Sequence, residues 1–335
     1  MARAEREEKV RSRWPWVAAA AVVAASLFFI VKGCAFLPWN SERAPLRVRV
    51  TVTRDFGTLV LKDREVEVSA EASALRALME VCEVETAYGG GFVKGIDGLA
   101  SGYLADTGGG TKMDWFFYLN GQMADVGSDA YVLREGDWVL FDYHSWEHSL
   151  FTAFLAGCFP EPFLHGYQGP PGGVVVLYAP GREEEARRVS RLLEGAGASP
   201  CVLREMGDDW RPSQGEYAVL VGTWKEMEDN TYIREVQENA PRVGIYAFFR
   251  EGRLVVLDAE GREKRVLDAG AGLVTGTGPR LGDGRSVLLV SGTDEEGLQA
   301  ALSLLEDPEV RGRAPVTAWV TVAGEGALGV PGEVE

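Results

Sequence analysis

Residues 115–146 read WFFYLNGQMADVGSDAYVLREGDWVLFDYHSW, and this stretch decides the fold. Trp115–Asn120 is rich in aromatic residues, which favour strands. Asn120-Gly121 predicts a tight turn because both residues tolerate positive φ. A second turn is expected at Glu135-Gly136-Asp137, and Trp138–Tyr143 then has the alternation of a half-buried strand. The stretch therefore predicts two strands of one sheet, with more aromatic surface than a small core needs.

The sequence before this stretch predicts the rest of an α+β domain. Leu46–Thr53 and Leu59–Val68 both alternate with period two, which is typical of strands in a hairpin. Ala70–Val84 changes to helical spacing, with Ser69 as the expected N-cap and an apolar face made by Leu75, Leu78, Met79 and Cys82. Tyr88–Gly91 is a glycine-rich loop before a short strand at Phe92–Ile96. This order of elements is that of a β-grasp-like domain.

Residues 46–146 resemble the transcobalamin-like C-terminal domain, a small module of vitamin B12 carriers and of bacterial surface proteins. The matching residues are Trp115, Tyr118–Gly121 (YLNG), Ala124–Gly127 (ADVG), Tyr131, Gly136-Asp137 and Tyr143–Trp146, with Tyr88–Val93 and Ile96–Gly98 upstream. The resemblance implies the same β-grasp architecture.

The resemblance also implies a ligand surface, because in the B12 carriers this module presses on one face of cobalamin with aromatic and backbone contacts. The residues it would use here are Trp115, Phe117, Tyr118 and Tyr131, with Tyr88 and Trp146 nearby. Aromatic side chains suit a large planar ligand. The alternative is that these rings are core residues and cross-strand pairs. The carriers cover the opposite face of the corrin with a helical domain, which this chain lacks, so cobalamin would need the second domain, another protein or another protomer.

The second half of the chain predicts a separate α/β domain at residues 172–324, followed by a flexible tail at 325–335. Gln168–Gly173 (QGPPGG) predicts a linker, which would end a first domain of residues 40–168. Apolar strands such as Val174–Tyr178 then alternate with the helical stretches Arg182–Glu194, Met227–Asn239 and Asp294–Leu305. This alternation is typical of a doubly wound α/β sheet. Either Thr293 or Asp294 is the expected cap of the last helix.

Residues 1–39 predict a short cytoplasmic tail and a membrane anchor. Residues 14–31 read WPWVAAAAVVAASLFFIV, with basic residues before them, which favours an uncleaved signal anchor with its N-terminus inside. A lipoprotein signal with Cys34 as the lipidated residue and a cleaved signal peptide are the alternatives. Each of the three places the bulk of the chain outside the cytoplasmic membrane, held there as a single-pass or lipid-anchored protein.

Composition and motifs exclude several classes of site. The formal net charge of −16 over 335 residues argues against binding nucleic acid. The four cysteines form no CxxC motif, so free thiols are expected, with one disulfide as the alternative. The glycine-rich run Gly270–Gly284 contains Pro279 and leads into a strand instead of a helix, which argues against a phosphate loop. His144, His148 and His165 are not expected to bind a metal, because His144 lies at a strand end.

These observations predict a non-catalytic, membrane-anchored, extracytoplasmic binding protein without a metal. The cofactor is unknown; the expected ligand is cobalamin, another corrinoid or a similar planar molecule, with an envelope or transporter protein as a further partner. The alternative is a structural or adhesive module of the cell envelope that binds protein or glycan. No enzyme is expected, because the sequence has no nucleophile elbow and no paired His–carboxylate motif.

Overall fold

A computed structural model describes residues 44–103, 110–152, 154–213, 215–277, 286–322, 324 and 326–334. The chain divides into two compact units, Met1–Ala44 and Pro45–Glu335. The predicted anchor at residues 14–39, with Cys34, lies outside the described residues. Within the described ranges, no helix has both the length and the apolar character needed to cross a bilayer.

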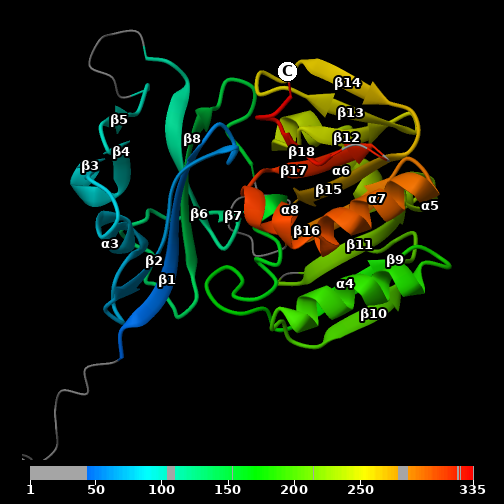
Figure 1. Cartoon of the computed structure of the whole chain (residues 1–335), viewed down its shortest axis with the longest axis horizontal. Coiled ribbons are helices and arrows are strands. Elements are labelled where there is room, and N and C mark those ends of the chain that lie inside the picture. Colours follow the sequence, from blue (N-terminus) through cyan, green and yellow to red (C-terminus); the bar gives the residue numbers. More distant parts are fainter. Residues whose placement is uncertain are drawn as a thin grey trace, which may run out of the picture. The chain divides into compact units, whose positions relative to one another are not determined.

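The first sheet has the strand order β2-β1-β8-β6-β7 (Figure 1). Strand β1 pairs antiparallel with β2 and parallel with the central strand β8, and β8 pairs antiparallel with β6. The bounds are β1 (Leu46–Arg54), β2 (Leu59–Val68), β6 (Met113–Leu119), β7 (Gln122–Met123) and β8 (Trp138–Ser145). The predicted turn at Asn120-Gly121 is confirmed: both residues have positive φ, and Leu119 pairs with Gln122 across it.

A short helix and a small sheet cover one face of the first sheet. The helix is α3 (Ala74–Met79), and the small sheet is β3 (Val84–Ala87), β4 (Phe92–Ile96) and β5 (Leu99–Ala100), with the turn η1 (Tyr88–Gly90) between β3 and β4. The helix is shorter than Ala70–Val84, and its N-cap is Ser73 instead of Ser69, because Ser69 closes a turn with Ala72. Met79 is therefore exposed, while Leu75 and Leu78 enter the core as expected.

The second sheet has seven strands in the order β10-β9-β11-β16-β15-β17-β18. The parallel strands are β9 (Val174–Tyr178), β10 (Cys201–Glu205), β11 (Tyr217–Thr223) and β16 (Val287–Gly292). Three antiparallel strands complete it, β15 (Ala271–Thr277), β17 (Ala318–Val322) and β18 (Leu328–Val330). The mixed α+β class is confirmed, and four strands of this sheet are parallel as predicted, but β15, β17 and β18 are antiparallel. The reason is that no described helix lies between β15 and β16, and a parallel pair needs such a crossover.

Helices and a further sheet cover the two faces of the seven-stranded sheet. One face packs on α4 (Glu183–Gly195) and α7 (Glu295–Glu306), which Figure 1 shows on the same side. Asp294 is the N-cap of α7, one of the two expected residues. The other face packs on α5 (Trp224–Met227), α6 (Thr231–Glu238), η3 (Ala240–Val243) and the three-stranded sheet β12 (Ala247–Arg250), β13 (Arg253–Leu257) and β14 (Glu263–Leu267).

Residues 154–163, which include η2 (Ala156–Cys158), contact both large sheets inside the unit Pro45–Glu335. The Leu155 N–H donates to the Gly121 carbonyl at the β6–β7 turn, and the Gly157 N–H donates to the Val316 carbonyl next to β17. Phe154 and Phe163 enter the core of the second sheet, whereas Leu155 and Cys158 pack on the first. A further helix, α8 (Pro308–Arg313), follows α7.

Candidate functional site

The aromatic surface predicted on β6 is not formed, because both faces of this strand are covered. Trp115 is 7% exposed and Tyr118 is 0% exposed, while Phe117 is half-buried. The Trp115 Nε1–H donates to the Leu99 carbonyl, and its ring lies 5.1 Å from that of Tyr143. Phe117 stacks on Phe141 at 5.1 Å, as cross-strand pairs do. Trp115 and Phe117 are therefore a core residue and a cross-strand pair member, which was the alternative to a ligand surface.

Tyr118 points to the opposite face of β6, where it packs with Phe116, Leu140, Leu155 and Cys158. The segment that contains Leu155 therefore occupies the place in which a planar ligand was expected. Burial raises the pKa of the Tyr118 hydroxyl well above its usual value.

The other three predicted ligand residues do not come together either. Tyr131 is 5% exposed and donates its hydroxyl to Asp137 Oδ2 at 3.3 Å. Trp146 is half-buried, with its Nε1–H donating to Asp114 Oδ2 at 2.9 Å. Tyr88 is 82% exposed, and its ring contacts Phe92, with the centroids 6.4 Å apart. Of the six predicted residues, only Tyr88 presents most of its ring to solvent.

Each histidine has a structural environment of its own. His144 is buried between the rings of Phe56 and Phe116, with its Nδ1 2.6 Å from Asp142 Oδ2. His148 packs on Tyr246, and His165 pairs with Glu161. Within the described ranges, no group of three or more histidine, cysteine or acidic side chains is arranged to hold a metal ion.

Carboxylates converge at the ends of β9 and β11, which is where parallel sheets often hold ligands. There the Arg182 guanidinium pairs with Glu185, Glu226 and Glu295. Burial by itself would raise the pKa of Glu226, but the hydrogen bond from Arg182 and those from Thr223 lower it below its usual value. The pKa of Glu295 is lowered as well, by hydrogen bonds from Gln299 and Arg182, so Glu226 and Glu295 are poorly suited to donate protons.

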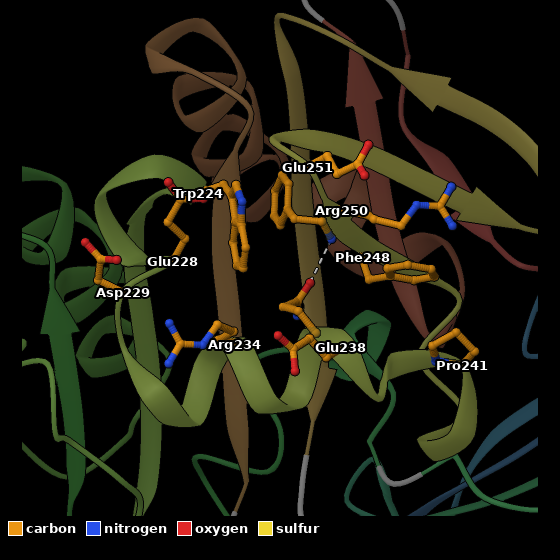
Figure 2. Close-up of a pocket in the computed structure, with 11 residues that line it drawn as sticks. Trp224, Glu228, Asp229, Arg234, Glu238, Pro241, Phe248, Arg250 and Glu251 are labelled. Carbon is orange, nitrogen blue, oxygen red and sulfur yellow. Dashed lines mark hydrogen bonds between the residues drawn. The ribbon is translucent and has the colours of Figure 1, made fainter.

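A solvent-open pocket of about 570 Å³ lies where α5 and α6 meet β12 (Figure 2). We call it the Trp224 pocket. Trp224 begins α5 directly after β11, and a capping box between Thr223 and Glu226 fixes this start. Its indole stacks on Phe249 with the ring centroids 5.1 Å apart and the planes within 9°. Phe248 and Pro241 add further ring carbons to the lining.

The polar lining of the Trp224 pocket combines donors and acceptors. Arg250 is held by two hydrogen bonds to Glu263, at 2.7 and 2.8 Å. Gln237 accepts a hydrogen bond from the Phe249 N–H at 2.8 Å. The guanidinium of Arg234 and the carboxylates of Glu228, Asp229 and Glu238 line the same pocket without an ion pair to any described residue. In Figure 2, Arg234 and Glu238 extend from one helix below the Trp224 ring.

The Trp224 pocket was not predicted from the sequence. Met227–Asn239 was predicted as one helix, but the structure has α5 and α6 separated at Asn230, whose side chain caps α6 by accepting from the Ile233 N–H at 3.0 Å. Asparagine is a preferred N-cap, so the break was readable in the sequence. The contact of Trp224 with Phe249 joins residues 25 positions apart, which no local pattern predicts.

Comparison with known proteins gives one family model and two solved structures. The family model DUF4430, a domain of unknown function, matches residues 71–145. Haptocorrin in complex with Cbi is 15% identical with a TM-score of 0.25, and the match covers 32% of this chain and 26% of that one. A protein proposed to bind metal, from Ruminococcus gnavus ATCC 29149, is 16% identical with a TM-score of 0.23, over 30% of this chain and 97% of that one. No curated protein matches.

The matched region therefore lies within residues predicted to form the transcobalamin-like domain, and the chain spans about a quarter of the haptocorrin chain. Both TM-scores are below 0.5, so neither likeness carries a conclusion about what this chain binds.

Proposed function

We propose that this chain is a non-catalytic binding protein whose ligand site is the Trp224 pocket, and that the ligand is a saccharide. The observation that carries the proposal is the lining of the pocket: stacked aromatic rings beside a guanidinium and carboxylates that have no partner of their own among the described residues. A volume of about 570 Å³ suits a site for a small ligand or for one unit of a longer one.

The mixture of donors and acceptors favours a hydroxyl-bearing ligand. A hydroxyl both donates and accepts a hydrogen bond, so it can be satisfied by Arg234 on one side and by Glu238 on the other. The carbon–hydrogen face of a sugar ring would pack on half-buried Pro241 and on the small exposed part of Trp224, with Phe248, 5% exposed, beneath them. A purely anionic ligand would meet Glu228, Asp229 and Glu238, and a purely cationic one would meet Arg234.

The exposure of the carboxylates supports binding over catalysis. Glycoside cleavage uses a carboxylic acid whose proton is kept by an apolar, water-poor environment. Asp229 and Glu238 are exposed, and Glu228 is half-buried. Attachment to the outer face of a cell membrane through residues 14–39 remains part of the proposal, and it fits a module that meets envelope glycans.

Three of the six residues predicted to hold a corrinoid, Trp115, Tyr118 and Tyr131, are buried and offer it no surface. A cobalamin titration followed by absorbance tests it directly in the full-length protein. We expect no saturable spectral change. A saturable change that persists when the Trp224 pocket is altered would place a corrin elsewhere and support the corrinoid hypothesis.

An oligosaccharide array probed with the full-length protein tests the proposal itself. The variants Arg234→Gln and Glu238→Gln each remove one exposed polar group without touching the core, and each should weaken binding about tenfold, since a hydrogen bond to a charged group contributes roughly 1.5 kcal/mol. Lys225→Gln removes an exposed charge on α5 that does not line the pocket, and it should bind as the wild type does. Absence of any saccharide ligand, equal binding by all variants, or cleavage of the bound sugar would each contradict the proposal.

A further inference from the structure

A second pocket, of about 520 Å³, lies within the unit Pro45–Glu335 between β1, the start of β8, residues 158–164 and α8. We call it the Arg311 pocket. Its apolar lining includes Phe159 and Leu164, and its charged lining includes Arg49, Glu161 and Arg311. It shares no lining residue with the Trp224 pocket.

Two of these charged groups are already engaged inside the protein. The Arg49 guanidinium donates from Nε and Nη2 to the two carboxylate oxygens of Asp63, at 2.8 Å each. It also lies over the indole of Trp138, with its Cζ 4.0 Å from the ring centroid. The Glu161 side chain, 8% exposed, accepts from the His165 N–H at 3.1 Å and pairs with His165 Nδ1. The side chains of Arg49 and Glu161 are therefore held in place by these contacts and line one side of the pocket.

Arg311 differs from them. It extends from α8 into the pocket, and its guanidinium has no ion pair with any described residue. Its Nε is buried and has no hydrogen-bond partner in the described part of the chain. A buried N–H without an acceptor costs on the order of 1–3 kcal/mol, and more where the group is charged. The planar fork of a guanidinium matches two oxygens of a carboxylate or phosphate.

The surrounding charges select between these two anions. Glu65, Glu135 and Glu161 line the same pocket as Arg311. Arg47 and Arg49 also line it, but they pair with Glu67 and Asp63. A dianionic phosphate would therefore meet the three glutamates with twice the charge of a carboxylate. The ring of Phe159 and the side chain of Leu164 meanwhile offer a place for an apolar substituent next to the guanidinium.

We propose that the Arg311 pocket is a second ligand site, which takes a singly charged carboxylate bearing an apolar group. The carboxylate oxygens accept from the Nη atoms of Arg311, since its Nε is closed to solvent, and the apolar group lies against Leu164 and the small exposed part of Phe159. The saccharide site at Trp224 is independent of it, so either proposal can fail alone.

Nuclear magnetic resonance of the full-length protein tests the proposal, because a buried arginine Nε–H gives its own signal. That signal is assigned as the one missing from Arg311→Lys. Benzoate is the probe, and benzamide, of the same shape but uncharged, is the matched control, both at constant ionic strength. We expect benzoate to shift the Arg311 signal to saturation and to bind at least about tenfold more tightly than benzamide or inorganic phosphate.

Variants separate this site from general anion binding. Arg311→Gln and Arg311→Lys should each weaken benzoate binding about tenfold or more, observed through the amide signals of Phe159 and Leu164. Arg187→Gln removes an exposed arginine paired with Glu183 on α4 and should leave benzoate binding unchanged. A linear, unsaturated response to benzoate, tighter binding of phosphate, or equal binding by the Arg311 variants would overturn the proposal.

Discussion

At the scale of single residues, the side chains that line the two pockets differ in how their charges are satisfied. His165 shows the effect of a partner on one group: its hydrogen bond with Glu161 raises the pKa of the imidazole above its usual value of about 6.5. Glu161 is held in turn by the His165 N–H, so the pair fixes residues 161–165 at the edge of the Arg311 pocket. Protonation of His165 therefore strengthens the pairing that holds residues 161–165 in place.

This linkage predicts a pH-dependent effect of Glu161→Gln. A group whose pKa is raised on folding stabilises the protein below its unfolded pKa, and this stabilisation is lost as the pH rises through the folded pKa. The free energy of unfolding lost in Glu161→Gln should therefore be largest between about pH 5 and 6.5 and should shrink above that range. Urea unfolding at several pH values measures it.

A titration of the histidine ring signals gives the matching control. In Glu161→Gln the pKa of His165 should fall, because the hydrogen bond from Glu161 that raises it is lost. A His165 pKa that is the same in both proteins would show that Glu161 is not the cause of the shift.

At the scale of elements, the β6–β7 turn shows how a local signal and a distant contact act on the same residue. Asn120-Gly121 predicted the turn from the sequence alone, and Gly121 has the expected positive φ of 76°. The segment 155–158 then packs on it, so that a Cβ at Gly121 would lie 2.8 Å from the Cβ of Cys158. Glycine is required there first by the turn and second by this contact.

Gly121→Ala and Gly89→Ala separate these two requirements. Gly89 has the same φ of 76°, but a Cβ there would have nothing within 4 Å. Gly89→Ala should destabilise the fold by about 1 kcal/mol, from the left-handed backbone alone. Gly121→Ala should cost roughly 1–3 kcal/mol more, because the contact with Cys158 is overpacked. Denaturant unfolding of both variants checks this. An equal loss in the free energy of unfolding would show that segment 155–158 moves aside without an energetic penalty.

The same elements show why part of the fold was readable and the site was not. The alternation in Leu46–Val68 and Trp138–Tyr143 predicted strands that exist, because burial on one or two faces leaves a local pattern. The pattern on β6 could not reveal which chain segment covers the Tyr118 face, since Leu155 and Cys158 reach it from another part of the sequence. The Trp224 pocket depends in the same way on α6 meeting β12, which is a tertiary contact.

At the scale of the whole described unit, residues from the two predicted domains share one core. Phe56, in the β1–β2 turn, is 3% exposed and belongs to the core of the second sheet. Its ring stacks on His144 of the first sheet, with centroids 4.3 Å apart, and meets Tyr246 edge-on at 5.1 Å. Gln122 adds a polar contact by accepting from the Ser286 hydroxyl at 2.6 Å. This packing is continuous across the predicted linker at residues 168–173.

The shared core predicts that residues 45–335 unfold in a single cooperative transition, and that Phe56→Ala divides it. Removing a buried phenylalanine ring costs about 3–5 kcal/mol, and here the loss falls on contacts that join the two sheets. Scanning calorimetry should show one endotherm for the wild type and two for Phe56→Ala. Val93→Ala removes a buried group inside the first domain only, so it should lower the midpoint without dividing the transition. Two endotherms in the wild type would instead mean that the two domains fold separately and that Phe56 only covers their boundary.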